Sequence, residues 1–260
     1  VRLTTLQLKM PKFILAEFNT HRIFSRSSSS SRAIPTKKII ESVLSGSLPF
    51  VSIGKNKSGM QAQEEVDLAI RAKFETEWFQ LANIVSQFVR RWNEEYGIHK
   101  QVANRPLDVF VYTETVVTAT EWSNFFILRD HPDAQPEMRS LAIMMKKAIV
   151  QSDPTYRSDE NDWHLPYVSD GEREFIQYKN QQEMSLELAK ISAARCARVS
   201  YLNHDGSKPD WKKDLELYER LAGSTPIHAS PLEHPAYPLG DSSFIRNFRG
   251  WRQLRDVIEN

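Results

Sequence analysis

The segment from residue 60 to residue 96, MQAQEEVDLAIRAKFETEWFQLANIVSQFVRRWNEEY, repeats its apolar residues every three or four positions. This spacing predicts one long amphipathic helix, and Gly97 is suited to cap its C-terminal end. A helix of this kind constrains the rest of the chain, because the fold must cover its apolar face. The chain is therefore expected to be rich in helices.

Shorter patterns surround this helix. The alternation in LTTLQL, residues 3 to 8, and the β-branched run VFVYTETVVTA, residues 109 to 119, predict two strands. The serine-rich residues 25 to 32 and most of 151 to 181 are expected to be loop. These elements indicate the α+β class, with a small sheet packed against long helices in a single catalytic domain, residues 1–260. Residues 12–24 are expected to form a short helix or a helix-like turn. Further helices are expected at 35–44, 122–128, 136–150, 182–199, 210–221 and after Gly250.

The composition excludes several classes of site. The net charge is +1, so no overall bias favours nucleic acid or a membrane surface. None of the nine glycines forms GxGxxG or a P-loop, which would bring a backbone close to phosphate. Cys196 is the only cysteine, so neither an intramolecular disulfide nor a cysteine-built metal site can form. We expect a reduced, cytoplasmic protein in which Cys196 serves packing, and no membrane-spanning segment.

The stretch THRIFSRSSSSSRAIP, residues 20 to 35, places five serines between arginines. Hydroxyls, loop amides and arginines together suit an oxyanion such as phosphate. A flexible serine linker and a nonspecific RNA-binding peptide have the same composition. From these residues alone, the three interpretations stay open.

Three other clusters carry polar side chains. NFFILRDHPDAQPEMR, residues 124 to 139, is either a polar turn between helices or a site that uses Arg129. IHASPLEHPAYP, residues 227 to 238, has His and Glu in a proline-stiffened turn, but no HExxH and no third zinc ligand. ARCARVSY, residues 194 to 201, combines small residues for close helix packing with two arginines. No metal site is expected in any of them.

Together these stretches resemble the flavin-dependent thymidylate synthases. HRIFSRSSSSSR is similar to the family signature RHRxxSxNxxSxR, and the segment around Arg129 is similar to LRxxxHAQxE. ARCARVSY and IHASPLEH resemble the ARVSF and HxTPFEH segments, which come first in the usual family and last here. The order therefore resembles a circular permutant of a bacteriophage type, which a fold tolerates when its termini are exposed and close together. The chain departs from the family pattern at Glu17, Thr20, Ser27, Ser28 and Asp133.

The resemblance implies reductive methylation of dUMP to dTMP, with methylenetetrahydrofolate supplying the carbon and NADPH reducing FAD. It implies a homotetramer in the (host) cytoplasm, without nucleic-acid or membrane partners. Arg129 is the implied catalytic residue. The implied FAD contacts are His21, Arg22, Ile23, Ser25, Asn124, Ser200, His228, Ser230 and Glu233. The implied substrate contacts are Glu17, Thr20, Ser28, Ser29, Ser30, Arg32, Arg105 and Arg129.

Two alternatives remain beside this function. The departures from the motif suggest an enzyme of the same fold that makes another modified pyrimidine nucleotide, such as a hydroxymethylated product. A non-catalytic nucleotide or RNA binder that uses the Ser/Arg stretch would also fit, and it predicts a protein without flavin.

Overall fold

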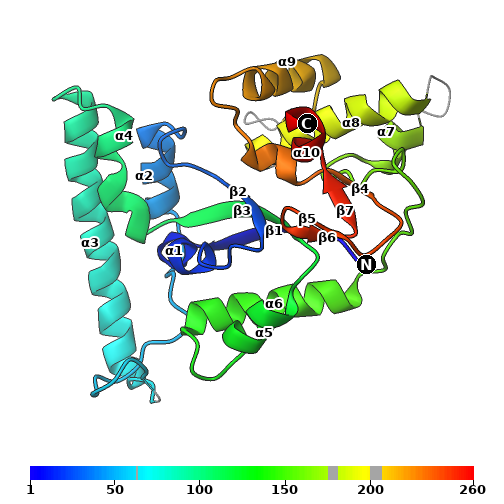
Figure 1. The fold of residues 1–260 in the computed structure, drawn as a ribbon. Helices are drawn as coiled ribbons and strands as arrows, with labels where there is room; N and C mark the ends of the chain where they lie inside the picture. Colours follow the sequence, from blue (N-terminus) through cyan, green and yellow to red (C-terminus); the bar gives the residue numbers. More distant parts are fainter. Residues whose placement is uncertain (63, 175–180, 200–206) are drawn as a thin grey trace.

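A three-stranded antiparallel sheet lies at the centre of the protein (Figure 1). The computed structural model describes residues 1–62, 64–174, 181–199 and 207–260. The strand order is β1-β3-β2, and the central strand, which is paired along both edges, is the most buried of the three. The strands are β1 (Thr4–Pro11), β2 (Ser25–Ser28) and β3 (Tyr112–Ala119).

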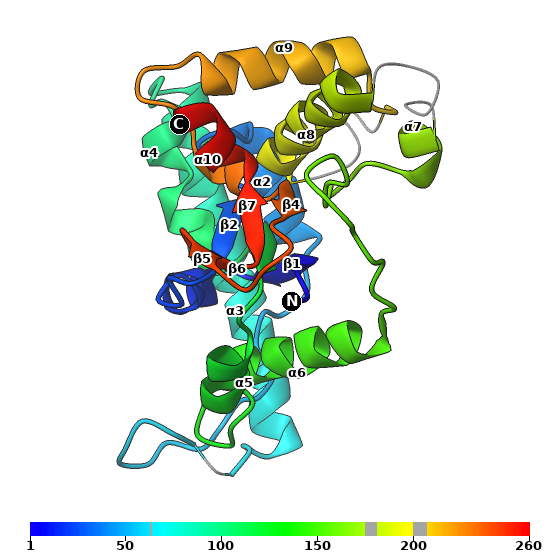
Figure 2. The same cartoon turned by 45° about the vertical axis from the view of Figure 1, so that its right-hand side comes forward.

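Three groups of helices surround this sheet. In both views α8, α9 and α10 lie at one end of the molecule, whereas α5 and α6 lie at the other (Figures 1 and 2). The long helix α3 packs on α2 and α4 along a third side. The helices are α1 (Leu15–Phe18), α2 (Thr36–Leu44), α3 (Leu68–Glu94), α4 (Lys100–Ala103), α5 (Ser123–Arg129), α6 (Pro136–Gln151), α7 (Asp170–Glu174), α8 (Gln181–Arg198), α9 (Trp211–Ala222) and α10 (Leu254–Glu259). Short 3₁₀ turns are η1 (Lys12–Ile14), η2 (Arg105–Val109) and η4 (Ser230–Glu233).

The long helix is confirmed, but it begins later than the apolar spacing predicts. Asp67 caps its N-terminus, and the carboxylate accepts a hydrogen bond from the amide of Ile70. The residues just before it are extended instead, because Gly54 and Glu65 form an antiparallel bridge.

Two expectations about local structure are wrong. The serine run does not form a loop throughout, since Ser25–Ser28 pairs with β3 in the register Ser25↔Thr118 and Ser28↔Thr115. The hydroxyl of Ser28 bonds Thr115 Oγ1 on the neighbouring strand at 2.8 Å. Serine hydroxyls favour a loop when they bond their own nearby backbone, and this cross-strand bond takes the place of such a contact.

The chain end after Gly250 is the second correction. Residues Trp251–Gln253 form strand β7, which pairs with β4 (Ala236–Pro238), and the helix begins only at Leu254. Gly250 itself adopts φ +71°, and a Cβ there would lie 2.8 Å from the carbonyl oxygen of Asp241. Two further short strands, β5 (Phe244–Ile245) and β6 (Phe248–Arg249), form a hairpin before it.

Candidate functional site

Arg129 meets two residues of the N-terminal segment. Its Nη1 forms an ion pair with Glu17, and its Nε donates to His21 Nε2 at 2.9 Å. Burial lowers the pKa of His21 to about 4, with a further contribution from the positive charges of Arg129 and Arg26. His21 is therefore neutral at pH 7, which is the state that can accept the Arg129 hydrogen bond.

The turn between α1 and β2 holds this arrangement in place. Arg26 Nη1 donates to the carbonyl oxygens of Asn19 at 2.8 Å and His21 at 3.0 Å. In the same turn Arg22 is exposed and Ile23 is half-buried, while the Thr20 hydroxyl donates to the carbonyl of Glu17. The turn thus presents Arg22 to solvent and keeps His21 inside.

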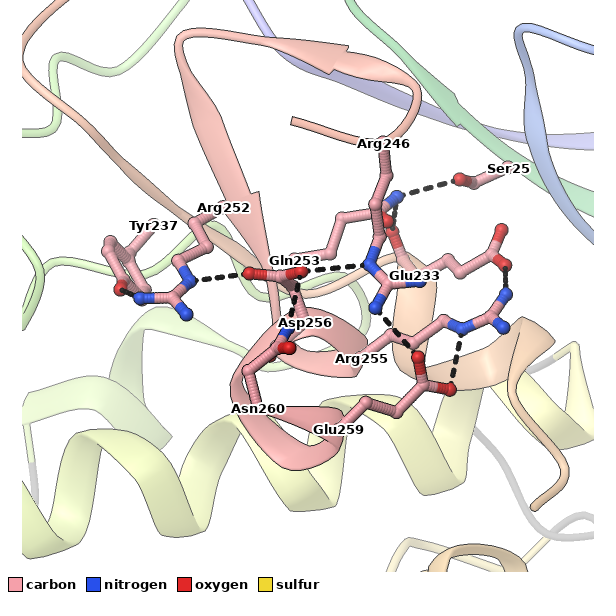
Figure 3. A network of polar contacts seen from close by, with 10 residues as sticks. All are labelled: Ser25, Glu233, Tyr237, Arg246, Arg252, Gln253, Arg255, Asp256, Glu259 and Asn260. Atoms are coloured by element: carbon pink, nitrogen blue, oxygen red, sulfur yellow. Dashed lines mark hydrogen bonds and ion pairs between the residues drawn. The ribbon is translucent and has the colours of Figure 1, made fainter. Parts of the chain in front are cut away.

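The start of β2 is tied to the C-terminal segment. Ser25 is fully buried, and its hydroxyl accepts from the side-chain amides of Gln253 and Asn247, each at 2.9 Å. Gln253 also donates to the carbonyl of Glu233, whose carboxylate pairs with Arg255 at 2.7 Å (Figure 3). Of the predicted flavin contacts, Ser25 and Glu233 are therefore close together, although Ser25 faces the interior.

The end of β2 borders a cleft of about 990 Å³. Ser28, Ser29 and Ser30 line it, together with Lys9. The Ser29 hydroxyl contacts Thr113 Oγ1 at 3.1 Å, whereas Ser30 is exposed and its hydroxyl accepts from the amide of Arg32 at 3.4 Å. Ser30 and the exposed Arg32 are consequently the members of the run best placed to reach a ligand.

The cleft and the Arg129 cluster lie toward opposite ends of the sheet. Ser25, next to the Arg129 cluster in sequence, pairs with Thr118, whereas Ser29 contacts Thr113. These two threonines are five positions apart on β3, which corresponds to roughly 16 Å along the strand. The structure therefore places the residues around Arg129 and the serines of the cleft in two separate groups within one chain.

The other predicted residues are dispersed. Arg105 is exposed and lies 3.8 Å from Asp108. Asn124, His228 and Ser230 are exposed on α5 and at η4, and η4 packs on β2. Ser200 lies outside the described residues.

Sequence reasoning missed a buried chain of hydrogen bonds across the sheet. His164 Nε2 bonds Thr5 Oγ1 at 2.7 Å, Thr5 bonds Thr118 at 2.7 Å, and Thr118 bonds His234 Nδ1 at 2.8 Å. His234 Nε2 then reaches Ser27 Oγ at 3.1 Å. Burial lowers the pKa of each of these two histidines to about 3, so both are neutral. Thr5 and Thr118 both lie in segments that the sequence predicts to be strands. Only the pairing register shows that the two threonines lie opposite each other.

Two negative observations concern the described residues. Within them no group of three or more His, Cys, Asp or Glu side chains is arranged to hold a metal ion. No helix in the same ranges has both the length and the apolar character required to cross a bilayer.

Comparison with known proteins identifies the family. The family model described as thymidylate synthase complementing protein, Thy1, matches residues 3–155. This match covers more than half of the chain, so the chain belongs to the Thy1 family. The family resemblance expected from the sequence is thereby confirmed. No curated protein matches the chain.

Solved structures similar to the chain include two relevant proteins. A UMP/dUMP methylase PolB from Streptomyces cacaoi, bound with 5-Br UMP, is 18% identical with a TM-score of 0.48, over 57% of this chain and 68% of that chain. The flavin-dependent thymidylate synthase ThyX from Helicobacter pylori, complexed with FAD and dUMP, is 18% identical with a TM-score of 0.38, over 56% of this chain and 67% of that chain.

Proposed function

We propose that the chain methylates dUMP to dTMP with FAD, taking the carbon from methylenetetrahydrofolate and the electrons from NADPH. The observation that carries this proposal is the contact of Arg129 with Glu17 and His21. These residues come from two separate segments of the family match, and the resemblance assigns each of them to the substrate or the flavin. Family membership and this convergence support the same reaction.

The residues in and near the turn between α1 and β2, which we call the motif turn, fit a flavin nucleotide. FAD carries a diphosphate, and the exposed guanidinium of Arg22 offers a bidentate cation for it. Exposed Ser230 lies on η4, which packs directly on β2, so a hydroxyl is available beside the same turn. Arg22, Ile23, His228 and Ser230 would hold the cofactor. When bound, FAD would supply the reducing equivalents.

Arg129 would bind the pyrimidine edge. Two of its five N–H groups go to Glu17 and His21, which leaves three directed donors in a fixed plane. Donors in this position stabilise the negative charge that develops at N3 and O2 while C5 acts as the nucleophile. Glu17 and the neutral His21 would fix the orientation of the guanidinium. Cys196 is fully buried, and burial raises the pKa of its thiol, so we assign it to packing.

Ser30 and Arg32 would bind the phosphate of dUMP, with Arg105 adding charge. Because this group and Arg129 are separated along the sheet, we propose that facing copies of the chain complete each site, in a homotetramer. The exposed apolar side chains on α3 support an interface, since Leu81, Ile84 and Phe88 recur at helical spacing and are 48%, 51% and 44% exposed. The permuted order of segments stays a prediction.

A related enzyme that makes another modified pyrimidine is the second candidate. Glu17 is one of the departures from the family pattern and pairs with Arg129, which would place a carboxylate beside the base. Ser27, in the position of the family asparagine, is bonded to His234 in the interior. A non-catalytic nucleotide binder is the third candidate.

Product mass separates these candidates. Purified protein with FAD, NADPH, methylenetetrahydrofolate and labelled dUMP should yield dTMP. A hydroxymethylated product would replace the proposal with the second candidate. Absence of both flavin binding and turnover would favour the binder.

A further inference from the structure

Arg198 is an additional cation at the cleft beside the serine run. It ends α8, and Ala197, Arg198 and Val199 line the cleft together with Ser28–Ser30. Cys196 and Val199 pack against Val116 of β3, which pairs with Ser27 of the motif strand. The end of α8 is therefore fixed against the strand that carries the serines, although it is distant in sequence.

A buried ionic network orients Arg198. Arg195 and Asp214 are both fully buried, and Arg195 Nε donates to Asp214 Oδ2 at 2.8 Å. Arg195 also forms hydrogen bonds with both carboxylate oxygens of Glu172, at 2.7 and 3.0 Å. The second oxygen of Asp214 accepts from Arg198 Nη2. Arg195 thus pairs with the carboxylates of both Asp214 and Glu172. Of these two carboxylates, Arg198 pairs only with that of Asp214.

Arg198 has unused donors in a confined position. Its side chain is 10% exposed, and among the described residues Asp214 is its only hydrogen-bond or ion-pair partner. Its Nε is buried, and no acceptor for it lies within the part of the chain that the structure describes. Because Nε is enclosed, a ligand in the cleft can reach only the exposed part of the Arg198 side chain. Val199 adopts φ 55°, a strained conformation for a β-branched residue, at the same wall of the cleft.

The charges and hydroxyls around the cleft suit a phosphate. Lys9 supplies a second cation, and Ser30 supplies an exposed hydroxyl. Glu114 is the one carboxylate among the cleft-lining residues of the described chain, and it accepts a hydrogen bond from Gln7. Guanidinium forks bind phosphate through paired, charge-assisted hydrogen bonds.

We propose that Arg198 binds the 5′-phosphate of the pyrimidine nucleotide in this cleft, and that Asp214 is its positioning residue. The inference rests on the proposed function, which places the nucleotide phosphate at Ser30 and Arg32. It adds a phosphate contact from α8, outside the region matched by the family model.

The test compares dUMP with deoxyuridine, which lacks the phosphate, by isothermal titration calorimetry. Wild-type protein should bind dUMP more tightly than deoxyuridine. Arg198→Gln should weaken dUMP binding about 10- to 100-fold and leave deoxyuridine binding unchanged. The matched control is Arg220→Gln, which removes the same charge from an exposed position on α9 and should behave as wild type.

The outcomes distinguish this inference from the proposed function. If Arg198→Gln binds dUMP as tightly as wild type does, Arg198 is not a phosphate contact, and the proposed function is unaffected. If wild-type protein binds no dUMP, both fail. If circular dichroism shows that Arg198→Gln is unfolded, Arg198→Met decides, because it keeps the aliphatic stem but loses the charge and every N–H donor. Wild-type dUMP affinity in that variant overturns the inference, and selective weakening of dUMP binding supports it.

Discussion

Replacing Arg129 with glutamine should nearly abolish turnover in a protein that still folds. The substitution removes the ion pair with Glu17 and the hydrogen bond to His21. The side chains of Arg129 and Glu17 are 21% and 27% exposed, so water screens the pair, and it contributes about 1 kcal/mol to stability. The hydrogen bond adds about 1 kcal/mol. A total of about 2 kcal/mol is small beside the 5 to 15 kcal/mol typical of a folded domain.

The expected effect on catalysis is larger. Loss of a donor that stabilises transition-state charge costs about 3 to 4 kcal/mol, which corresponds to a decrease in kcat of roughly 10²- to 10³-fold. The same change should raise the pKa of His21 above its value of about 4, because the Arg129 charge helps to lower it. Burial is the larger cause and persists, so the pKa should stay below 6.5.

The assay combines dTMP formation at saturating dUMP, the unfolding midpoint, and an NMR titration of the His21 ring. Arg90→Gln, an exposed change on α3, is the matched control. Turnover of Arg129→Gln within threefold of wild type would refute the assignment of Arg129 to the base. An unchanged His21 pKa would refute the described contact.

Three further predictions follow from single contacts. Arg32→Gln, at an exposed position, should raise the Kd for dUMP about 10- to 100-fold with an unchanged melting temperature, and an unchanged Kd would remove Arg32 from the phosphate site. Thr118→Val removes the hydrogen bonds to Thr5 and to the buried His234, and it should lower the free energy of unfolding by about 2 to 3 kcal/mol in urea titrations, whereas exposed Thr155→Val should have little effect. Burial lowers the pKa of His164 and His234 to about 3, so the unfolded chain binds more protons below pH 6.5. Stability should therefore decline as pH falls from about 6.5 to about 3, and a flat profile of urea midpoints in that window would contradict the neutral state of these histidines.

Elements set by local pattern were predictable from the sequence. The periodic segment of α3 and the β-branched run of β3 are both present in the structure. Ser25–Ser28 was not predictable as a strand, because its stability comes from threonines on a partner strand about 90 residues away. Trp251–Gln253 likewise became a strand only through pairing with Ala236–Pro238. Tertiary pairing overrode the local tendency in both cases.

The candidate site likewise contains residues that the sequence predicted and residues that only the fold revealed. Motif resemblance selected Arg129, Glu17 and His21, and the structure joins them. It covered Arg198 within ARCARVSY but gave it no role, because an arginine on a small-residue helix has no distinguishing pattern until the fold places it in the cleft. Nor did it indicate that Ser25 faces Gln253 and Asn247 in the interior.

The most direct test of the proposed function is the visible absorption spectrum of the purified protein during titration with dUMP. We predict a bound flavin spectrum that shifts as dUMP is added, since the motif turn and Arg129 meet at His21. A colourless protein that takes up no added FAD would contradict the proposed function.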